Sequence, residues 1–218
     1  MEASALVKSF RSRVDDLESP YLTSDALVLD WAAEAETEAA TRARLLKDNS
    51  STMTQIAVLS GQRTYKADQR IFEVCSALWN GQGTPLQVIH PSHFETQMPR
   101  WRDHESSKPT AIMFENNTIT IYPKPTQAGT LNLEVYRTPI YDIEELDDEF
   151  EIQSMHQRRL IDWVLYRYYS QEDVEVRDEE KAMVSLARFE DSFGMKYSAD
   201  SMRKQSQRRR HTTRRILC

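Results

Sequence analysis

Residues 25–59 read DALVLDWAAEAETEAATRARLLKDNSSTMTQIAVL, and within them a helical pattern gives way to a strand pattern. Apolar residues recur every three or four positions, which predicts a helix over about residues 25–47 with Ser24 as its N-cap. Over residues 53–59 apolar and polar residues alternate, which predicts a strand. Residues 48–51 therefore mark the point where a helical region ends and a β region begins.

Upstream of this point, a short amphipathic helix is predicted near the N-terminus. Leu6, Phe10, Val14 and Leu17 follow one another at helical spacing, and Pro20 lies beyond the end of the pattern. The stripe of the second helix is mostly alanine, which allows two helix backbones to approach closely. We expect it to serve as a contact helix rather than to fill a core.

Downstream, short strand patterns alternate with turn residues rich in Gly, Asn and Pro. Residues 53–59 and 63–66 flank Ser60 and Gly61, which predicts a hairpin. The further strands are predicted at residues 71–78, 86–89, 111–114, 118–122 and 131–136. So many short strands predict a small antiparallel sandwich or barrel.

After Pro139 the helical period returns. It predicts helices over about residues 150–170 and 178–193, the second closed by Gly194. The apolar stripes of the predicted helices form the candidate bundle or subunit contacts: Val28, Trp31, Ala35, Ala39, Leu160, Ile161, Val164, Leu165, Leu186, Phe189 and Phe193. We expect these side chains to be largely buried, either within a bundle or between subunits.

The order helices, strands, helices predicts an α+β protein. Helices from both ends of the chain would form a bundle, and a small antiparallel β domain would be inserted between them. The predicted parts are residues 1–50 and 141–199 for the bundle, 51–140 for the β domain, and 200–218 for an extended C-terminal arm.

The charge is distributed unevenly along the chain. The net charge is −6, but residues 200–218 carry +6, which leaves −12 for residues 1–199. The arm has too little apolar surface to fold alone, so we expect it to dock on another subunit, a partner protein or nucleic acid. Its candidate binding residues are Arg203, Lys204, Arg208, Arg209, Arg210, Arg214, Arg215, Ile216 and Leu217.

An acidic run precedes the third predicted helix. Its candidate interface or channel residues are Asp142, Glu144, Glu145, Asp147, Asp148 and Glu149, and Glu151 follows them. Three interpretations stay open. The run is a hydrated linker feeding a helix N-terminus, a Mg²⁺ site for nuclease chemistry, or a patch that meets a basic partner surface. A contiguous run repels itself and stays solvated, which disfavours the metal site.

No constellation of catalytic residues stands out. The five glycines form no phosphate-binding motif, and His90, His93 and His104 have no cysteine or carboxylate at ligand spacing. No nucleophile has a base beside it in a recognisable pattern. We therefore expect no enzyme activity, no metal and no cofactor.

Composition also bears on where the protein works. No stretch approaches the roughly 20 apolar residues of a membrane helix, and no signal-peptide pattern is present. Cys75 and Cys218 are too few for a disulfide framework, which fits a reducing compartment. We expect a soluble protein that is not secreted by the signal-peptide route and has no membrane partner.

Several short motifs resemble those of the head-to-tail adaptor (connector) proteins of tailed bacteriophages. They are WAAEA at 31–35, SGQRTY at 60–65, PRWR at 99–102, ITIYPKP at 119–125 with GTL at 129–131, VYRTP at 135–139, and the helix at 181–194. The resemblance spans about residues 20–195.

This resemblance implies a structural role without an active site. It implies a homo-oligomeric ring of twelve copies in the neck of the virion, assembled in the host cytoplasm. The ring would bind the portal protein on one side and a tail or nozzle protein on the other. Genomic DNA would pass through its channel without specific binding. The alternative that the residues leave open is a nucleic-acid-binding module that uses the basic arm.

Overall fold

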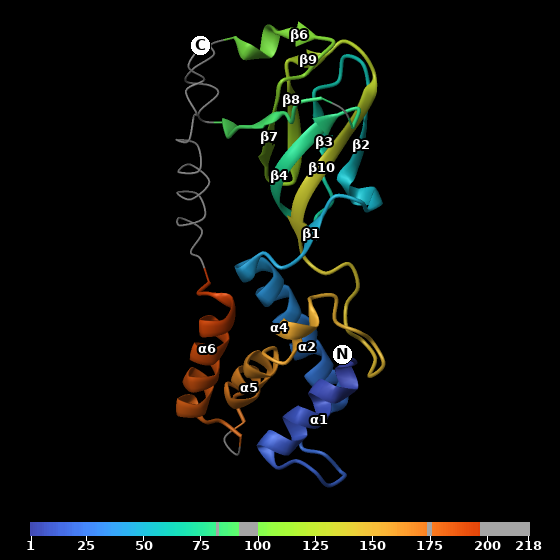
Figure 1. Ribbon diagram of the computed structural model, residues 1–218. Helices are drawn as coiled ribbons and strands as arrows, with labels where there is room; N and C mark the ends of the chain where they lie inside the picture. The colour runs from blue at the N-terminus through green and yellow to red at the C-terminus, as the bar shows by residue number, and fades with distance from the viewer. Residues whose placement is uncertain (82, 92–99, 174–175, 197–218) are drawn as a thin grey trace. The chain divides into compact units, whose positions relative to one another are not determined.

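The computed structural model describes residues 1–81, 83–91, 100–173 and 176–196, and the chain divides into two compact units (Figure 1). The helical unit comprises Met1–Leu46 and Thr138–Lys196, whereas Lys47–Arg137 form the β unit. Helices and sheets are both present, so the predicted α+β class is confirmed. The predicted arm, residues 200–218, lies outside the described residues.

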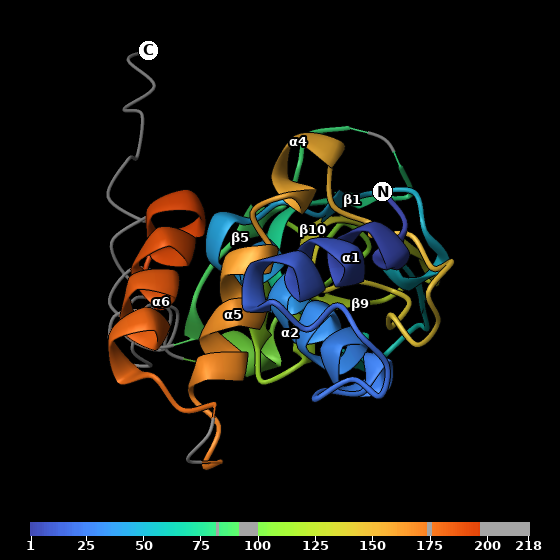
Figure 2. The ribbon, with the colours of Figure 1, turned by 90° about the horizontal axis from the view of Figure 1, so that it is seen from below.

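The helical unit is built around a cluster of aromatic side chains. Its helices are α1 (Ala3–Val14), α2 (Asp25–Ala43), α4 (Ser154–Gln157), α5 (Ile161–Tyr169) and α6 (Glu179–Phe193). Phe10 is fully buried, and its ring centroid lies 5.2 Å from that of Tyr168. The ring centroids of Trp163 and Phe189 are 4.9 Å apart. Helix α5 packs against α1, α2 and α6 (Figure 2). Within the described ranges, no helix has both the length and the apolar character that crossing a bilayer requires.

The first two helices end earlier than their apolar patterns predict. In each case the next residue adopts a left-handed conformation, at Asp15 (φ 58°) and Arg44 (φ 53°), and its N–H returns to the helix. Leu17, which the pattern assigned to the first helix, is therefore 61% exposed in the following loop. The predicted N-cap is confirmed, because the Ser24 side chain accepts a hydrogen bond from Leu27 N.

A buried arginine joins α1 to the start of α2. Arg11 donates to Asp16 and to Asp25 at 2.5 Å each, and to the carbonyl oxygen of Thr23 at 2.9 Å. The guanidinium also lies over the ring of Tyr21, 3.5 Å from its centroid. The loop between the two helices thus folds around one side chain that it neutralises.

The helix predicted over residues 150–170 is broken in two. Around Leu160 the backbone hydrogen bonds join each N–H to the carbonyl oxygen three residues earlier, as from Leu160 N to Gln157 O. This tighter turn separates α4 from α5. Residues 150–153, which the pattern placed in the helix, are not helical. Gln157 holds them by donating to Phe150 O and Ile152 O, while Glu36 on α2 accepts from Ile152 N at 2.9 Å.

The β unit contains two four-stranded sheets and a small pair. Its strands are β1 (Lys47–Asp48), β2 (Gln55–Val58), β3 (Thr64–Lys66), β4 (Ile71–Trp79), β5 (Gln87–Val88), β6 (Glu105–Ser106), β7 (Ala111–Glu115), β8 (Thr118–Tyr122), β9 (Lys124–Pro125) and β10 (Gly129–Arg137), with short 3-10 helices at Thr52–Thr54 and Trp101–Asp103. In the first sheet β10 pairs with β4 along one edge and with β1 and β2 along the other. The order in the second is β3-β8-β7-β5. Apolar side chains of both sheets, such as Ile112, Ile119, Leu131 and Val135, share one core.

Two expectations for this unit are wrong. The unit was expected to be antiparallel, but β5 pairs with β7 and β6 with β9 in parallel. The hairpin predicted around Ser60 and Gly61 does not form, because β2 pairs with β10 in one sheet and β3 with β8 in the other. The turn instead passes the chain between sheets, and Tyr65 Oη braces it by accepting from Leu59 N at 2.8 Å.

Candidate interaction surfaces

The acidic run forms an ordered loop that holds the N-terminus of α1. Within this acidic loop, defined as residues 141–149, the carbonyl oxygens of Asp148 and Leu146 accept hydrogen bonds from Ala3 N and Ser4 N at 2.8 Å each. The first N–H groups of a helix have no partner inside it, so the loop satisfies donors that would otherwise need water. One interpretation was that the acidic run leads into the N-terminus of the helix that follows it. The loop does contact a helix N-terminus, but it is that of α1, far away in sequence.

One of the six acidic side chains turns inward and shapes the loop. Asp148 accepts hydrogen bonds from Glu145 N at 2.8 Å and Glu144 N at 2.9 Å, and these two N–H groups lower the pKa of its carboxyl. Ile143 and Phe150, which flank this turn, are buried in the core of the helical unit. The exposed carboxylates are those of Asp142, Glu144, Glu145, Asp147 and Glu149.

Exposed apolar side chains accompany these carboxylates. Tyr141 is 80% exposed and Leu146 is 41% exposed, although both lie on a loop that is fixed at several points. Behind the loop, burial raises the pKa of Glu36, whereas the N–H groups of Ile152 and Glu151 act against that effect. The acidic loop is therefore an ordered, mixed acidic and apolar surface.

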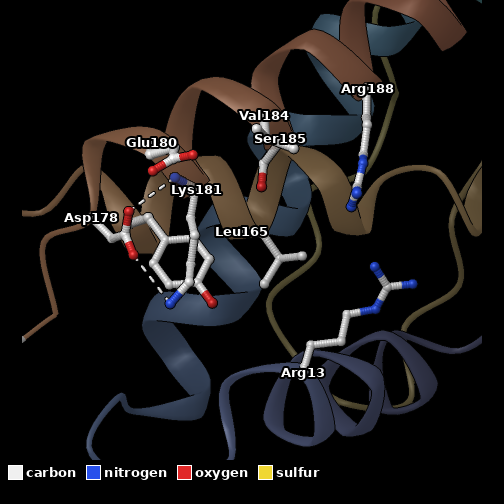
Figure 3. A pocket seen from close by; sticks show the side chains of 9 residues that line it. Arg13, Leu165, Asp178, Glu180, Lys181, Val184, Ser185 and Arg188 are labelled. Carbon is white, nitrogen blue, oxygen red and sulfur yellow. Dashed lines mark hydrogen bonds and ion pairs between the residues drawn. The ribbon is translucent and has the colours of Figure 1, made fainter.

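A second surface lies between α1, α5 and α6. It is an open groove of about 500 Å³, and Figure 3 shows its lining side chains. The lining of this α1–α5–α6 groove consists of Arg13, Leu165, Tyr169, Asp178, Glu180, Lys181, Val184, Ser185 and Arg188. The three helices come from both ends of the chain, so a sequence pattern within one segment gives no sign of the groove.

The two ends of the groove differ in charge. At one end Lys181 Nζ lies 3.1 Å from Asp178 Oδ2, and hydrogen bonds from the backbone and side chain of Lys181 lower the pKa of Asp178. At the other end the guanidinium groups of Arg13 and Arg188 point toward one another from α1 and α6 (Figure 3). Among the described residues, neither guanidinium has an ion-pair partner.

A buried carboxyl on α5 feels the same arginines. Asp162 is only 4% exposed, and burial raises its pKa, while the charges of Arg13, Arg188 and Arg159 act in the opposite direction. This carboxyl interacts electrostatically with both groove arginines but forms no ion pair with either of them.

The predicted contact residues mostly lie inside the helical unit. Ten of the eleven are buried there, and the remaining one, Leu186, is half-buried against the same core. The alanine stripe of α2, including Ala35 and Ala39, is fully buried within the chain. It therefore packs the core of one subunit, contrary to the expectation that it is a contact helix rather than a core-filler.

The histidines and acids do not gather into a metal site among the described residues, where no group of three or more potential ligands occurs. His104 Nδ1 is 2.7 Å from the hydroxyl of Tyr122, while His93 lies outside the described residues. The predicted arm residues also lie outside them.

The described residues thus present two charged surfaces, the acidic loop and the α1–α5–α6 groove, and no group of potential metal ligands. The family model described as SU10 adaptor protein matches residues 1–216, so the chain belongs to this family. It is a structural adaptor protein of a bacteriophage, and the resemblance inferred from the sequence motifs is confirmed. No curated protein matches the chain.

Proposed function

We propose that this protein is a head-to-tail adaptor that forms a ring beneath the phage portal and links it to tail or nozzle components. The observation that carries this proposal is the family match over residues 1–216. The ordered acidic loop and the α1–α5–α6 groove support it, because an assembly protein needs fixed surfaces that present charge and apolar groups together.

In this proposal twelve copies surround the DNA exit channel in the neck of the virion, after assembly in the host cytoplasm. The helical unit is the bundle and the β unit is the domain inserted into it. Residues 1–199 carry a net charge of −12, which suits a conduit because it repels phosphate and keeps passing DNA from adhering.

The basic arm, residues 200–218, docks on the portal or on a neighbouring adaptor subunit in contact with it. Ordering such an arm costs about 1 to 2 kcal/mol per residue, whereas an exposed ion pair contributes about 0 to 1 kcal/mol. Charge alone is therefore insufficient, and Ile216 and Leu217 supply an apolar anchor at the tip. Repetition around a ring multiplies a weak affinity per arm.

The test is assembly of the purified chain onto portal-bearing heads, read as the mass of the assembly and as ring density by electron microscopy. The full chain should bind as a ring. Deleting residues 200–218, or combining Ile216→Asp with Leu217→Asp, should weaken attachment while the subunit still folds. Met155→Asp with Leu17→Asp is a matched control, because both are exposed apolar residues of the helical unit and neither belongs to residues 200–218.

Heads that accept no full-length chain would overturn the adaptor role, and normal attachment of the arm variants would overturn the docking role alone. The high arginine content of the arm favours one competing function, the binding of nucleic acid. That function would instead show as a DNA affinity that falls steeply with salt and is lost on deleting the arm.

A further inference from the structure

The acidic loop and the α1–α5–α6 groove lie at opposite ends of α1. The loop binds the first N–H groups of α1, at Ala3 and Ser4, whereas Arg13 in the last turn lines the groove. A helix rises about 1.5 Å per residue, so the ten residue steps from Ala3 to Arg13 separate the two surfaces by about 15 Å along α1. In Figure 2 α1 runs from the N-terminus toward α5 and α6. The two surfaces of one chain therefore cannot meet each other.

The two surfaces are complementary in charge. The acidic loop exposes five carboxylates, and the groove presents the guanidinium groups of Arg13 and Arg188, which converge without an ion-pair partner among the described residues (Figure 3). The acids of the groove do not oppose this pairing strongly. Asp178 is neutralised by Lys181, and Glu180 lies at the end away from the two arginines. An incoming carboxylate would thus meet a locally positive site.

The two surfaces are also complementary in their apolar groups. The loop exposes Tyr141 and Leu146, while the groove exposes Val184, which is 45% exposed; Leu165, at the base of the groove, is 5% exposed. Exposed ion pairs contribute little by themselves, so a stable contact needs apolar area at its centre. Leu146 between Glu145 and Asp147 supplies an apolar side chain with a carboxylate on either side, and the groove offers the exposed Val184 together with two arginines.

From these observations we infer that the acidic loop of one copy docks in the α1–α5–α6 groove of the next copy, joining subunits head to tail. The inference deepens the proposed function, since it rests on ring formation and names the surfaces that form the ring. Unlike surfaces at opposite ends of a rigid unit make a heterologous contact, which closes into a ring when the rotation between copies allows it.

Mixed disulfide cross-linking tests the contact directly. One variant carries Leu146→Cys and the other Val184→Cys, both in a chain with Cys75→Ala and Cys218→Ser. A disulfide requires Cα atoms within about 7 Å, so cross-linking reports close approach. Mild oxidation of the mixture should give a disulfide dimer that neither variant gives alone.

Charge reversal then tests the specificity of the contact. Arg13→Glu with Arg188→Glu in the Val184→Cys variant should lower the dimer yield about tenfold, equivalent to about 1.4 kcal/mol. Glu144→Arg with Glu145→Arg in the Leu146→Cys variant should restore it. The matched control is Lys8→Glu with Arg158→Glu, which changes the charge equally at exposed positions outside the groove and should leave the yield unchanged.

Absence of the mixed dimer would overturn the inference. So would an equal yield of disulfide dimer from the Leu146→Cys variant alone, because that dimer would show a symmetric contact between two acidic loops. An unchanged yield after reversal of both arginines would overturn it as well. If the wild-type chain still forms rings on portal-bearing heads in those cases, the adaptor function stands and only this contact is wrong. A chain that cross-links as expected but never assembles on heads would contradict the adaptor function instead.

Discussion

Arg11→Met should destabilise the helical unit by about 3 to 4 kcal/mol, because the buried guanidinium of Arg11 neutralises the carboxylate of Asp16 in the loop between α1 and α2. The side chain of Asp16 is 4% exposed and lies 2.5 Å from Arg11. Removing one member of such a buried pair costs about 3 to 5 kcal/mol, since the other charge is left without compensation. Asp16 still accepts hydrogen bonds from Leu22 N and Thr23 N, which places the cost near the lower limit.

The other contacts of Arg11 add little to this value. Asp25 is 40% exposed, so losing its ion pair costs about 0.5 kcal/mol. Methionine retains most of the apolar stem, and the packing of α1 on the core is therefore largely preserved. The dominant loss is the uncompensated charge of Asp16.

The assay is thermal unfolding of the full chain, followed by calorimetry and by the helical signal in circular dichroism. A loss of about 3 kcal/mol should lower the midpoint of the helical unit by about 12 to 24 °C, given about 4 to 8 °C per kcal/mol for a domain of this size. Adding Asp16→Asn should restore at least half of the loss, because the amide oxygen still accepts from Leu22 N without a buried charge. A single variant within about 0.5 kcal/mol of the wild type would refute the reasoning.

Three further predictions follow from single contacts. Burial raises the folded-state pKa of Glu36, so the wild type should lose stability as pH rises above the ordinary glutamate pKa, and Glu36→Gln should reduce that loss in urea unfolding. Asp148→Ala should speed hydrogen exchange at the N–H groups of Glu144 and Glu145, measured by mass spectrometry. Gly129→Ala would place a Cβ 2.5 Å from the Trp79 ring, and should lower the thermal midpoint of the β unit with a loss of about 1 to 3 kcal/mol.

Local patterns were sufficient to predict the long helices and most of the longer strands, but not the two-residue strands β1, β6 and β9. The Ser24 cap and the apolar stripes of α2, α5 and α6 depend on contacts between neighbouring turns of one helix, which a sequence displays directly. Helix ends were less predictable, because a left-handed residue such as Arg44 terminates α2 although Leu45 and Leu46 continue its apolar pattern.

The pairing of strands and the form of the interaction surfaces depend on residues far apart in the chain. Local sequence patterns therefore could not specify them. A strand pattern followed by Ser60, Gly61 and a second strand is compatible with a hairpin or with a crossing between sheets, and only the partners β8 and β10 decide. The ordered state of the acidic loop depends on backbone bonds to Ala3 and Ser4, which no side-chain pattern encodes. One local signal was available, because Ile143 and Phe150 interrupt the acids at positions suited to a core.

The burial of the alanine stripe determines which surfaces remain for assembly. If Ala35 and Ala39 lay at the subunit boundary, the ring could be held by close helix packing, but both are fully buried within one chain. In the proposed ring, contacts between helical units would then use groups that the single subunit leaves exposed. On α6 these include Met183 and Val184, and on the acidic loop they include Tyr141 and Leu146. A ring held by such mixed apolar and charged contacts should assemble less readily at high salt, whereas one held by alanine-lined helices would not.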